Sequence, residues 1–171
     1  VTAHEKVQDI ADALGDFNHG GTFSHHAVGA AAALAVLRII QQEGLVENAA
    51  RLGPVLKQEL RQAFADHPYV GDIRGRGLFW ALEFVQDRET KEPFPASLGL
   101  AWRIRQRALE KGLIVYWSQG CADGQNGDLI LLGPPLIITE EQLAELVALL
   151  REAVVEVLAE VEGEVRLGQA V

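Results

Sequence analysis

Apolar residues follow a helical spacing in the first part of the chain and a strand-like spacing after it. Up to His67-Pro68 they recur every three or four residues, which places them on one face of a helix. From Tyr69 they alternate with polar residues, which places them on one face of a strand. The first part therefore predicts three helices, over residues 5–14, 24–43 and 46–65.

The second part of the chain predicts a small sheet with helices between and after its strands. The expected elements are a strand pair over residues 70–84 that breaks at Gly75-Arg76-Gly77, a helix over 98–111, strands over 113–117 and 129–132, and a last helix over 139–161. After Gly163 a frayed tail over residues 164–171 is expected.

Local signals mark the starts and interruptions of the helices. Thr139-x-x-Gln142 is a capping-box pattern, and Ser24 is a candidate N-cap for the second helix. That helix is apolar nearly all round, so burial on most of its faces is expected. Pro54 lies inside the third helix and predicts a kink or a restart. Together these features indicate an α+β fold, a small antiparallel or mixed sheet with helices on one face.

Composition narrows the classes of protein and of partner. The chain has 171 residues, of which 49% are hydrophobic and 23% charged, so one domain with a sizeable core is expected. The net charge of −9 argues against a nucleic-acid partner. Cys121 is the single cysteine, which excludes an intramolecular disulfide and fits a cytoplasmic location. It sits in a loop of small and polar residues without a nearby histidine, so no catalytic role is predicted for it.

A glycine turn leading into an alanine-rich helix is the strongest chemical signal. Gly20 and Gly21 allow close backbone approach to a partner, and the following helix directs free N–H groups and a positive dipole end to one place. Such a place suits a phosphate, and the hydroxyl of Thr22 adds a donor. The alternative is an ordinary turn in which the threonine only assists the start of the helix.

Three motifs resemble those of class III aminotransferases. His19-Gly20-Gly21-Thr22-Phe23-Ser24, followed by a helix, is similar to the family's His-Gly-His-Thr-Phe-Ser-Gly-His-Pro segment. Gly75-Arg76-Gly77-Leu78, with the later Glu83, resembles the family's Arg-Gly-x-Gly-Leu strand. Pro134-Pro135-Leu136-Ile137-Ile138-Thr139 resembles its Pro-Pro-Leu-Ile-Ile-Thr signature. The three matches stand in the family's order and span nearly the whole chain.

The resemblance implies a pyridoxal-phosphate enzyme of fold type I, of which this chain holds the interdomain helix and the small C-terminal domain. It implies the following parts: residues 1–23, the end of the large cofactor domain with the phosphate turn; 24–66, the interdomain helix and the next helix; 67–163, the small α/β domain; and 164–171, the tail. Thr22 and the N–H of Gly21 are expected to bind the cofactor phosphate of the other subunit in a homodimer. The chain departs from the motif in three places, since Gly21, His25 and Ala27 replace a bulky residue, a glycine and a proline.

The cofactor-binding lysine is expected upstream of this chain. Lys6, Lys57, Lys91 and Lys111 are its only lysines, and none stands where the resemblance places the catalytic one. The chain contains no methionine and begins with Val1, which also suggests a C-terminal piece. No catalytic residue is therefore assigned within it, and the piece alone is expected to be inactive.

Substrate contacts are less well defined. In the resembled family an arginine often holds the substrate carboxylate, at positions that here carry Tyr116 and Leu131. Either another residue holds that carboxylate or the substrate lacks it. Tyr116 is the candidate substrate contact, with Trp117 beside it, and core packing is the alternative. Arg74 and Arg76 are expected to form ion pairs rather than to bind substrate, and the histidines lack the spacing of metal ligands.

The resemblance implies transfer of an amino group from an amine or amino acid to a 2-oxo acid. A second function within the same fold is an aminomutase or racemase, which retains the amine. A different class is a binding or assembly module without catalysis, which requires a gene lacking the upstream cofactor domain.

Overall fold

The computed structural model describes residues 9, 10, 12, 13, 15 and 20–168, with side chains to Gly163. The chain divides into two compact units, residues 1–42 and 43–171. Most of the helix predicted over residues 5–14 lies outside the described residues. No single described helix is long and apolar enough to cross a membrane, although two consecutive helices pass that test jointly on length and composition.

Unit one contains the helix α2, Ala27–Gln42. The helix begins after the predicted Ser24, because the side chain of His26 rather than that of Ser24 caps it. None of its residues is buried within this chain, so the predicted burial on most faces is wrong for the described structure. The physical reason is that no described element of unit one lies against this helix, whose apolar side chains stay exposed.

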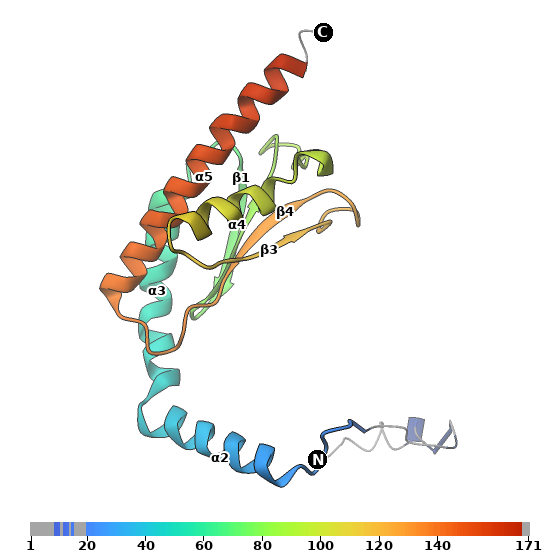
Figure 1. Ribbon diagram of the computed structural model, residues 1–171, viewed down its shortest axis with the longest axis vertical. Helices are drawn as coiled ribbons and strands as arrows, with labels where there is room; N and C mark the ends of the chain where they lie inside the picture. The colour runs from blue at the N-terminus through green and yellow to red at the C-terminus, as the bar shows by residue number, and fades with distance from the viewer. Residues whose placement is uncertain (1–8, 11, 14, 16–19, 169–171) are drawn as a thin grey trace. The chain divides into compact units, whose positions relative to one another are not determined.

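Unit two contains a four-stranded antiparallel sheet and helices on one of its faces (Figure 1). The strands pair in the order β1-β2-β4-β3. The elements in chain order are α3 (Leu45–Phe64), β1 (Val70–Arg76), β2 (Phe79–Phe84), the 3₁₀ helix η1 (Ala96–Leu98), α4 (Leu100–Glu110), β3 (Tyr116–Gln119), β4 (Asp128–Leu132) and α5 (Glu140–Gly168).

One face of this sheet is covered by helices and the other is open, which confirms the predicted α+β arrangement with helices on one face. Trp80, Leu82 and Ile130 belong to the packed face and are buried together with apolar side chains of α3, α4 and α5. On the opposite face Phe79 and Tyr116 are largely exposed. Alternation along the strands produces this division, because successive side chains point to opposite faces.

Most predicted elements of unit two are confirmed, some with changed ends. The capping box is present, since the Thr139 N–H donates to Gln142 Oε1 at 3.0 Å and the Gln142 N–H to Thr139 Oγ1 at 3.3 Å. The helix α3 continues through Pro54, so the restart predicted as one alternative does not occur. The backbone of α5 remains helical to Gly168, so the predicted frayed tail is wrong up to that residue.

The strand predicted over residues 113–117 is displaced towards the C-terminus. β3 begins at Tyr116, and Ile114, which the prediction placed within the strand, lies before it and is 82% exposed. The N–H of Leu113 donates to the carbonyl of Ala108 at 2.8 Å and thereby closes the end of α4. Gly112, with a φ of 87°, makes this helix ending possible. The helix thus uses a backbone group that the predicted strand would have needed.

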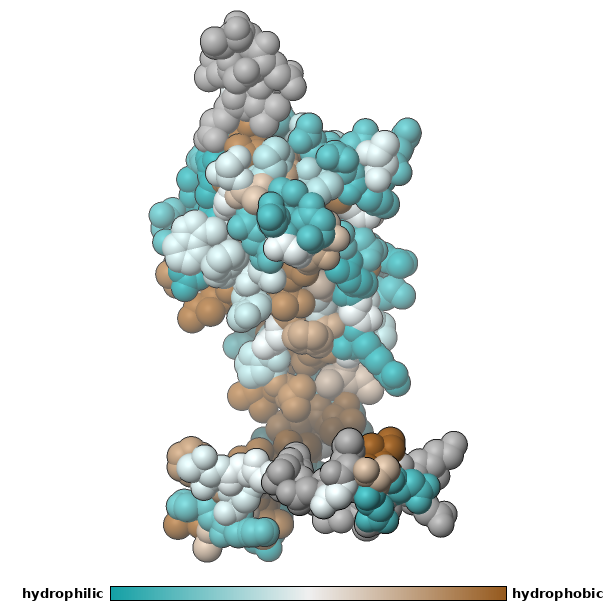
Figure 2. Space-filling model, turned by 90° about the vertical axis from the view of Figure 1, so that its right-hand side faces the viewer, coloured by the Kyte–Doolittle hydropathy of each residue, from teal (hydrophilic) through white to brown (hydrophobic). Residues whose placement is uncertain are grey.

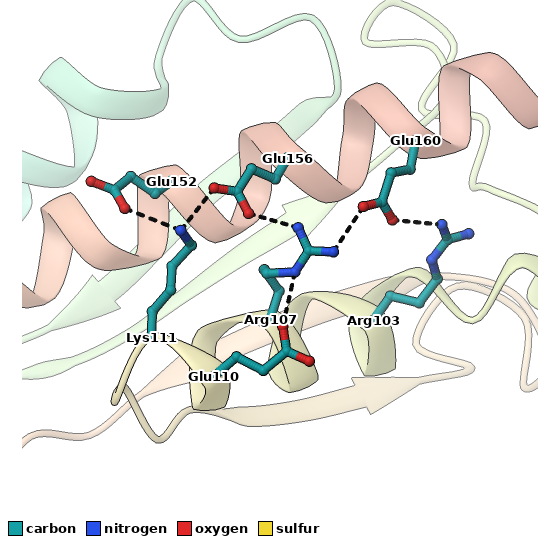
Figure 3. Close-up of polar contacts among 7 residues, drawn as sticks. All are labelled: Arg103, Arg107, Glu110, Lys111, Glu152, Glu156 and Glu160. Carbon is teal, nitrogen blue, oxygen red and sulfur yellow. Dashed lines mark hydrogen bonds and ion pairs between the residues drawn. The ribbon is translucent and has the colours of Figure 1, made fainter.

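A ladder of ion pairs joins α4 to α5 (Figure 3). Arg107 donates to Glu156 at 2.6 Å and to Glu160 at 2.8 Å, and Lys111 pairs with Glu156 at 2.7 Å. Arg103 and Glu152 extend the ladder at its two ends. The Glu156 and Glu152 carboxylates raise the pKa of Lys111 and so keep its amine protonated.

A close contact between α3 and the turn after β1 depends on glycine. A Cβ on Gly53 would lie 2.9 Å from both the Cα and the carbonyl oxygen of Gly77, which is backbone that cannot rotate away. By contrast, a Cβ on Gly163 of α5 would meet nothing within 4 Å.

Replacing each of these two helical glycines by alanine should change the free energy of unfolding in opposite directions. Gly53→Ala should destabilise the chain by about 1–3 kcal/mol, because the new methyl group forces α3 away from the hairpin. Gly163→Ala should stabilise it by about 0.5–1 kcal/mol through helix propensity. Urea unfolding of both variants beside the wild type measures the difference, and equal effects of the two substitutions would contradict the contact.

Asp128, at the start of β4, is fully buried and anchors the start of α4. Its Oδ1 accepts the N–H of Ala101 at 2.9 Å, while its Oδ2 has no hydrogen-bond partner among the described residues. Burial raises the pKa of Asp128 above its ordinary value of 3.8, and the bond from Ala101 opposes this only in part.

The raised pKa of Asp128 predicts a pH-dependent stability. The folded state binds the proton of Asp128 more tightly than the unfolded state, so protonation stabilises the fold as pH falls from 7 towards 3.8. Asp128→Asn removes this titration. The unfolding free energy of the wild type minus that of the variant should therefore rise as pH is lowered from 7 to 4, as measured by urea unfolding. A difference that stays constant or falls would exclude Asp128 as the source.

Candidate functional site

Hydrogen bonds of Ser24 close the glycine turn that the sequence singles out. The Ser24 N–H donates to the carbonyl of Gly21 at 2.9 Å, and the Gly21 N–H donates back to Ser24 Oγ at 3.1 Å. Ser24 therefore stabilises the turn and is not the N-cap of α2, which corrects the prediction. The Gly21 N–H, which was expected to bind phosphate, is already bonded within the turn.

Two histidines connect this turn to α2. His25 has a φ of 62°, in the left-handed region where most side chains are disfavoured. His26 accepts the N–H of Gly29 on its Nδ1 at 3.0 Å and so caps the helix. Sequence reasoning missed this cap because histidine is not among the preferred N-cap residues.

Thr22 lies exposed within the turn, and no described residue forms a hydrogen bond with its hydroxyl. The hydroxyl and the neighbouring backbone N–H groups form a neutral donor set, since the first charged side chain of α2 is Arg38. Neutral donors at a helix start fit one side of a phosphate group. The turn therefore suits a phosphate whose cationic partners come from elsewhere.

A separate apolar groove of about 750 Å³ lies on unit two, and Tyr116 is one of its walls. Tyr116 is 68% exposed and stands opposite Leu131 in the pairing of β3 with β4. The rest of the lining is apolar, including Phe79, Ile114 and Pro134. Figure 2 shows hydrophobic residues gathered in the lower half of unit two on the face it presents. Among the described residues that line the groove none is charged, and Tyr116 is the one with a polar side-chain group.

The loop after β4 forms the rim of this groove. Pro134 and Pro135 line the groove, and the loop that continues from them is fixed by Asn48 of α3. Its Nδ2 donates to the carbonyl of Leu136 at 2.7 Å and, more weakly, to that of Ile138 at 3.4 Å. A side chain far away in sequence thus holds the proline segment in place.

The remaining candidate side chains are engaged in structural contacts. Trp117 packs edge-on against Trp102 of α4, with ring centroids 5.3 Å apart, which favours the core alternative for this residue. Arg74 forms ion pairs with Asp72, at 2.9 Å, and with Glu83, as predicted. Partial burial and the nearby Glu83 raise the pKa of the Cys121 thiol, which opposes a nucleophilic role.

Comparison with known proteins identifies the family. A family model described as aminotransferase class III matches residues 1–154. The chain belongs to this family.

Individual class III relatives agree over most of the chain. An aminotransferase from Gibberella zeae is 44% identical over 151 residues, which cover 85% of this chain and 30% of the relative. The diaminobutyrate–2-oxoglutarate transaminase of Halomonas elongata is 43% identical over 150 residues, covering 88% and 31%. The PMP-bound form of an aminotransferase from Vibrio fluvialis superposes with a TM-score of 0.73 at 36% identity, over 91% of this chain and 32% of that one. The chain therefore spans about a third of the length of the relatives it matches.

Membership of the class III family raises the question whether any described lysine could bind the cofactor covalently. A lysine that bonds covalently to an aldehyde cofactor must first lose its proton. Lys111 is held protonated by its two glutamates, and the amine of Lys91 donates to the carbonyl of Gly71 at 2.9 Å. Lys57 is exposed on α3, and Lys6 lies outside the described residues. The expectation that the catalytic lysine lies upstream of this chain stays a prediction.

His25 stands where the class III motif resembled by this turn has glycine, and its φ of 62° explains that preference. His25→Gly should leave the turn within about 1 kcal/mol of wild-type stability. Glycine relieves the strain of the left-handed backbone, and this offsets the larger conformational entropy that it gives the unfolded chain. His25→Val should weaken the turn by about 1–2 kcal/mol, since a β-branched residue fits this region poorly.

Hydrogen exchange of the Gly21 and Gly29 amides measures the effect of these His25 variants. Both amides should exchange at similar rates in wild type and His25→Gly, and faster in His25→Val. Equal protection in all three proteins would contradict the strained turn.

Proposed function

We propose that this chain forms part of a pyridoxal-phosphate-dependent aminotransferase, which moves an amino group from an amine or amino acid to a 2-oxo acid. The observation that carries the proposal is the class III turn in which Thr22 presents a hydroxyl that no described residue binds. The PMP-bound form of the Vibrio fluvialis relative supports the same cofactor. When bound, pyridoxal phosphate supplies the electron sink for exchange of the amino group.

The proposed task of the turn is to bind the cofactor phosphate. The Thr22 hydroxyl donates a hydrogen bond to a phosphate oxygen, while Ser24 keeps the turn closed from within. The Gly21 N–H can bind the phosphate only if its hydrogen bond to Ser24 Oγ breaks. Thr22 is therefore expected to contribute more than Gly21 to phosphate binding. Because the turn brings no cation, the negative charge is balanced by groups outside the described residues.

We further propose a homodimer in which Thr22 serves the cofactor of the other subunit. The exposed apolar side chains of α2, which directly follows the turn, support an interface there. Val28 is 72% exposed and Leu37 is 56% exposed, although a helix that is apolar all round is normally covered. A second subunit is the proposed cover.

The proposed substrate wall is the apolar groove beside Tyr116. Its lining offers contact to the carbon chain of a substrate but no cation for a carboxylate. The phenol hydroxyl of Tyr116 can donate one hydrogen bond to a polar group that enters the groove. Within this proposal the groove orients the substrate and excludes water, and the proton transfers belong to the lysine outside the described residues.

The relative from Halomonas elongata favours amino transfer over the aminomutase and racemase alternatives, because its name specifies a 2-oxo acid partner. The test uses the protein expressed from the complete gene, supplied with 2,4-diaminobutyrate or a simple amine and with 2-oxoglutarate. Consumption of 2-oxoglutarate with equal formation of glutamate is expected. A rearranged or racemised amine without consumption of the 2-oxo acid would favour the aminomutase or racemase. If the protein neither binds the cofactor nor catalyses any reaction, a binding module is favoured.

Thr22→Ala should weaken cofactor binding roughly tenfold, because one hydrogen bond to a charged phosphate is lost. Thr22→Ser retains the hydroxyl and is the matched control, with affinity expected near that of the wild type. The dissociation constant of pyridoxal phosphate, measured by fluorescence on the protein expressed from the complete gene, gives the comparison. Unchanged affinity in Thr22→Ala would remove Thr22 from the phosphate site.

A further inference from the structure

The start of α2 depends on a single titratable side chain. The Nδ1 of His26 accepts the N–H of Gly29, and the carbonyl of His26 accepts the N–H of Ala30 at 2.9 Å. The first turn of α2 contains no acidic residue. Within the described chain, the imidazole of His26 is thus the side chain that accepts one of the free N–H groups of this helix end, that of Gly29.

This cap is continuous with the turn that carries Thr22. The His26 N–H donates to the carbonyl of Phe23 at 3.4 Å, and His25 in between is held in the left-handed region. Ser24 then closes the turn on Gly21. Loss of the cap would allow the backbone of His26 and His25 to change conformation. The direction in which the Thr22 hydroxyl points would then no longer be fixed.

We propose that His26 is a positioning residue, whose neutral imidazole holds the phosphate turn in its binding form and whose protonation releases it. The inference rests on the proposed function of Thr22 as a phosphate ligand. It adds that the affinity for a phosphate-bearing cofactor is set by a histidine that does not touch the cofactor.

The chemistry of imidazole gives the direction of the effect. A nitrogen that accepts a hydrogen bond carries no proton, so Nδ1 can cap the helix only in the neutral form. Protonation converts this acceptor into a donor that faces the Gly29 N–H. It also places a positive charge at the positive end of the helix dipole, which is unfavourable.

The other titratable groups of the described part of unit one are Asp9, Asp12, His25 and Arg38. No ion pair found among the described residues joins Asp9, His25 or Arg38 to His26. No described element of unit one packs against the capped end of α2. His25 is a second imidazole beside the turn, so the experiment keeps it unchanged in every variant.

The experiment compares wild type with His26→Asn and His26→Ala in the protein expressed from the complete gene. Asparagine is a strong N-cap that does not titrate, while alanine cannot cap. The dissociation constant of pyridoxal phosphate is measured at steps from pH 8 to pH 5.5. The cofactor phosphate itself titrates near pH 6 and affects all variants alike, so the ratio between variants is the quantity of interest.

At pH 8 wild type and His26→Asn should bind pyridoxal phosphate equally, and His26→Ala should bind about fivefold more weakly, which is the usual effect of one lost cap. At pH 5.5 wild type should have weakened about fivefold relative to His26→Asn and should match His26→Ala. Parallel pH profiles of wild type and His26→Asn, or equal affinity of wild type and His26→Ala at pH 8, would overturn the role of His26.

Thr22→Ala, measured in the same series, separates this inference from the function on which it rests. If Thr22→Ala binds as tightly as the wild type, the phosphate assignment fails and the role of His26 fails with it. If Thr22→Ala weakens binding while the His26 variants do not, the phosphate assignment stands and only the positioning role is excluded.

Discussion

One-sided burial of the sheet is the constraint on which unit two depends. The packed face joins Leu82 of β2 to Ile130 of β4, and this pair is completely shielded by the helices above it. Burial of such side chains contributes about 1.5–3 kcal/mol each, which is more than any surface contact of this unit provides. Every strand must therefore keep its register, because a shift by one residue would turn its apolar set outwards. The open face is left available for Tyr116 and the groove.

Unit one is built on a different principle, since local hydrogen bonds determine its form. Ser24 and His26 each bond to a backbone group three residues away, and none of the described residues of unit one is buried. Such local bonds contribute about 0.5–1.5 kcal/mol each. A turn with this construction is easily adjusted by its surroundings. That property agrees with a role in which a ligand and other parts of a larger protein complete the site.

Sequence reasoning succeeded where structure is local and failed where backbone groups have competing partners. The Thr139–Gln142 capping box was predicted because both partners lie within one helical turn. The start of β3 was placed too early because the N–H of Leu113 bonds to Ala108, a choice that apolar periodicity does not reveal. In the candidate site, Thr22 followed from the motif, whereas the exchange of roles between Ser24 and His26 depends on the conformation of His25. The groove beside Tyr116 joins segments that lie far apart in sequence, so only its individual residues could be proposed.

The ion-pair ladder between α4 and α5 repeats with the spacing of one helical turn. Arg103, Arg107 and Lys111 stand four residues apart, as do Glu152, Glu156 and Glu160. Sliding one helix along the other by a turn would exchange the partners but preserve most of the pairs, so charge alone cannot specify how far the helices overlap. The apolar side chains beneath must supply that information. The ion pairs therefore hold the two helices together without fixing their alignment, whereas the apolar core beneath them permits only one alignment.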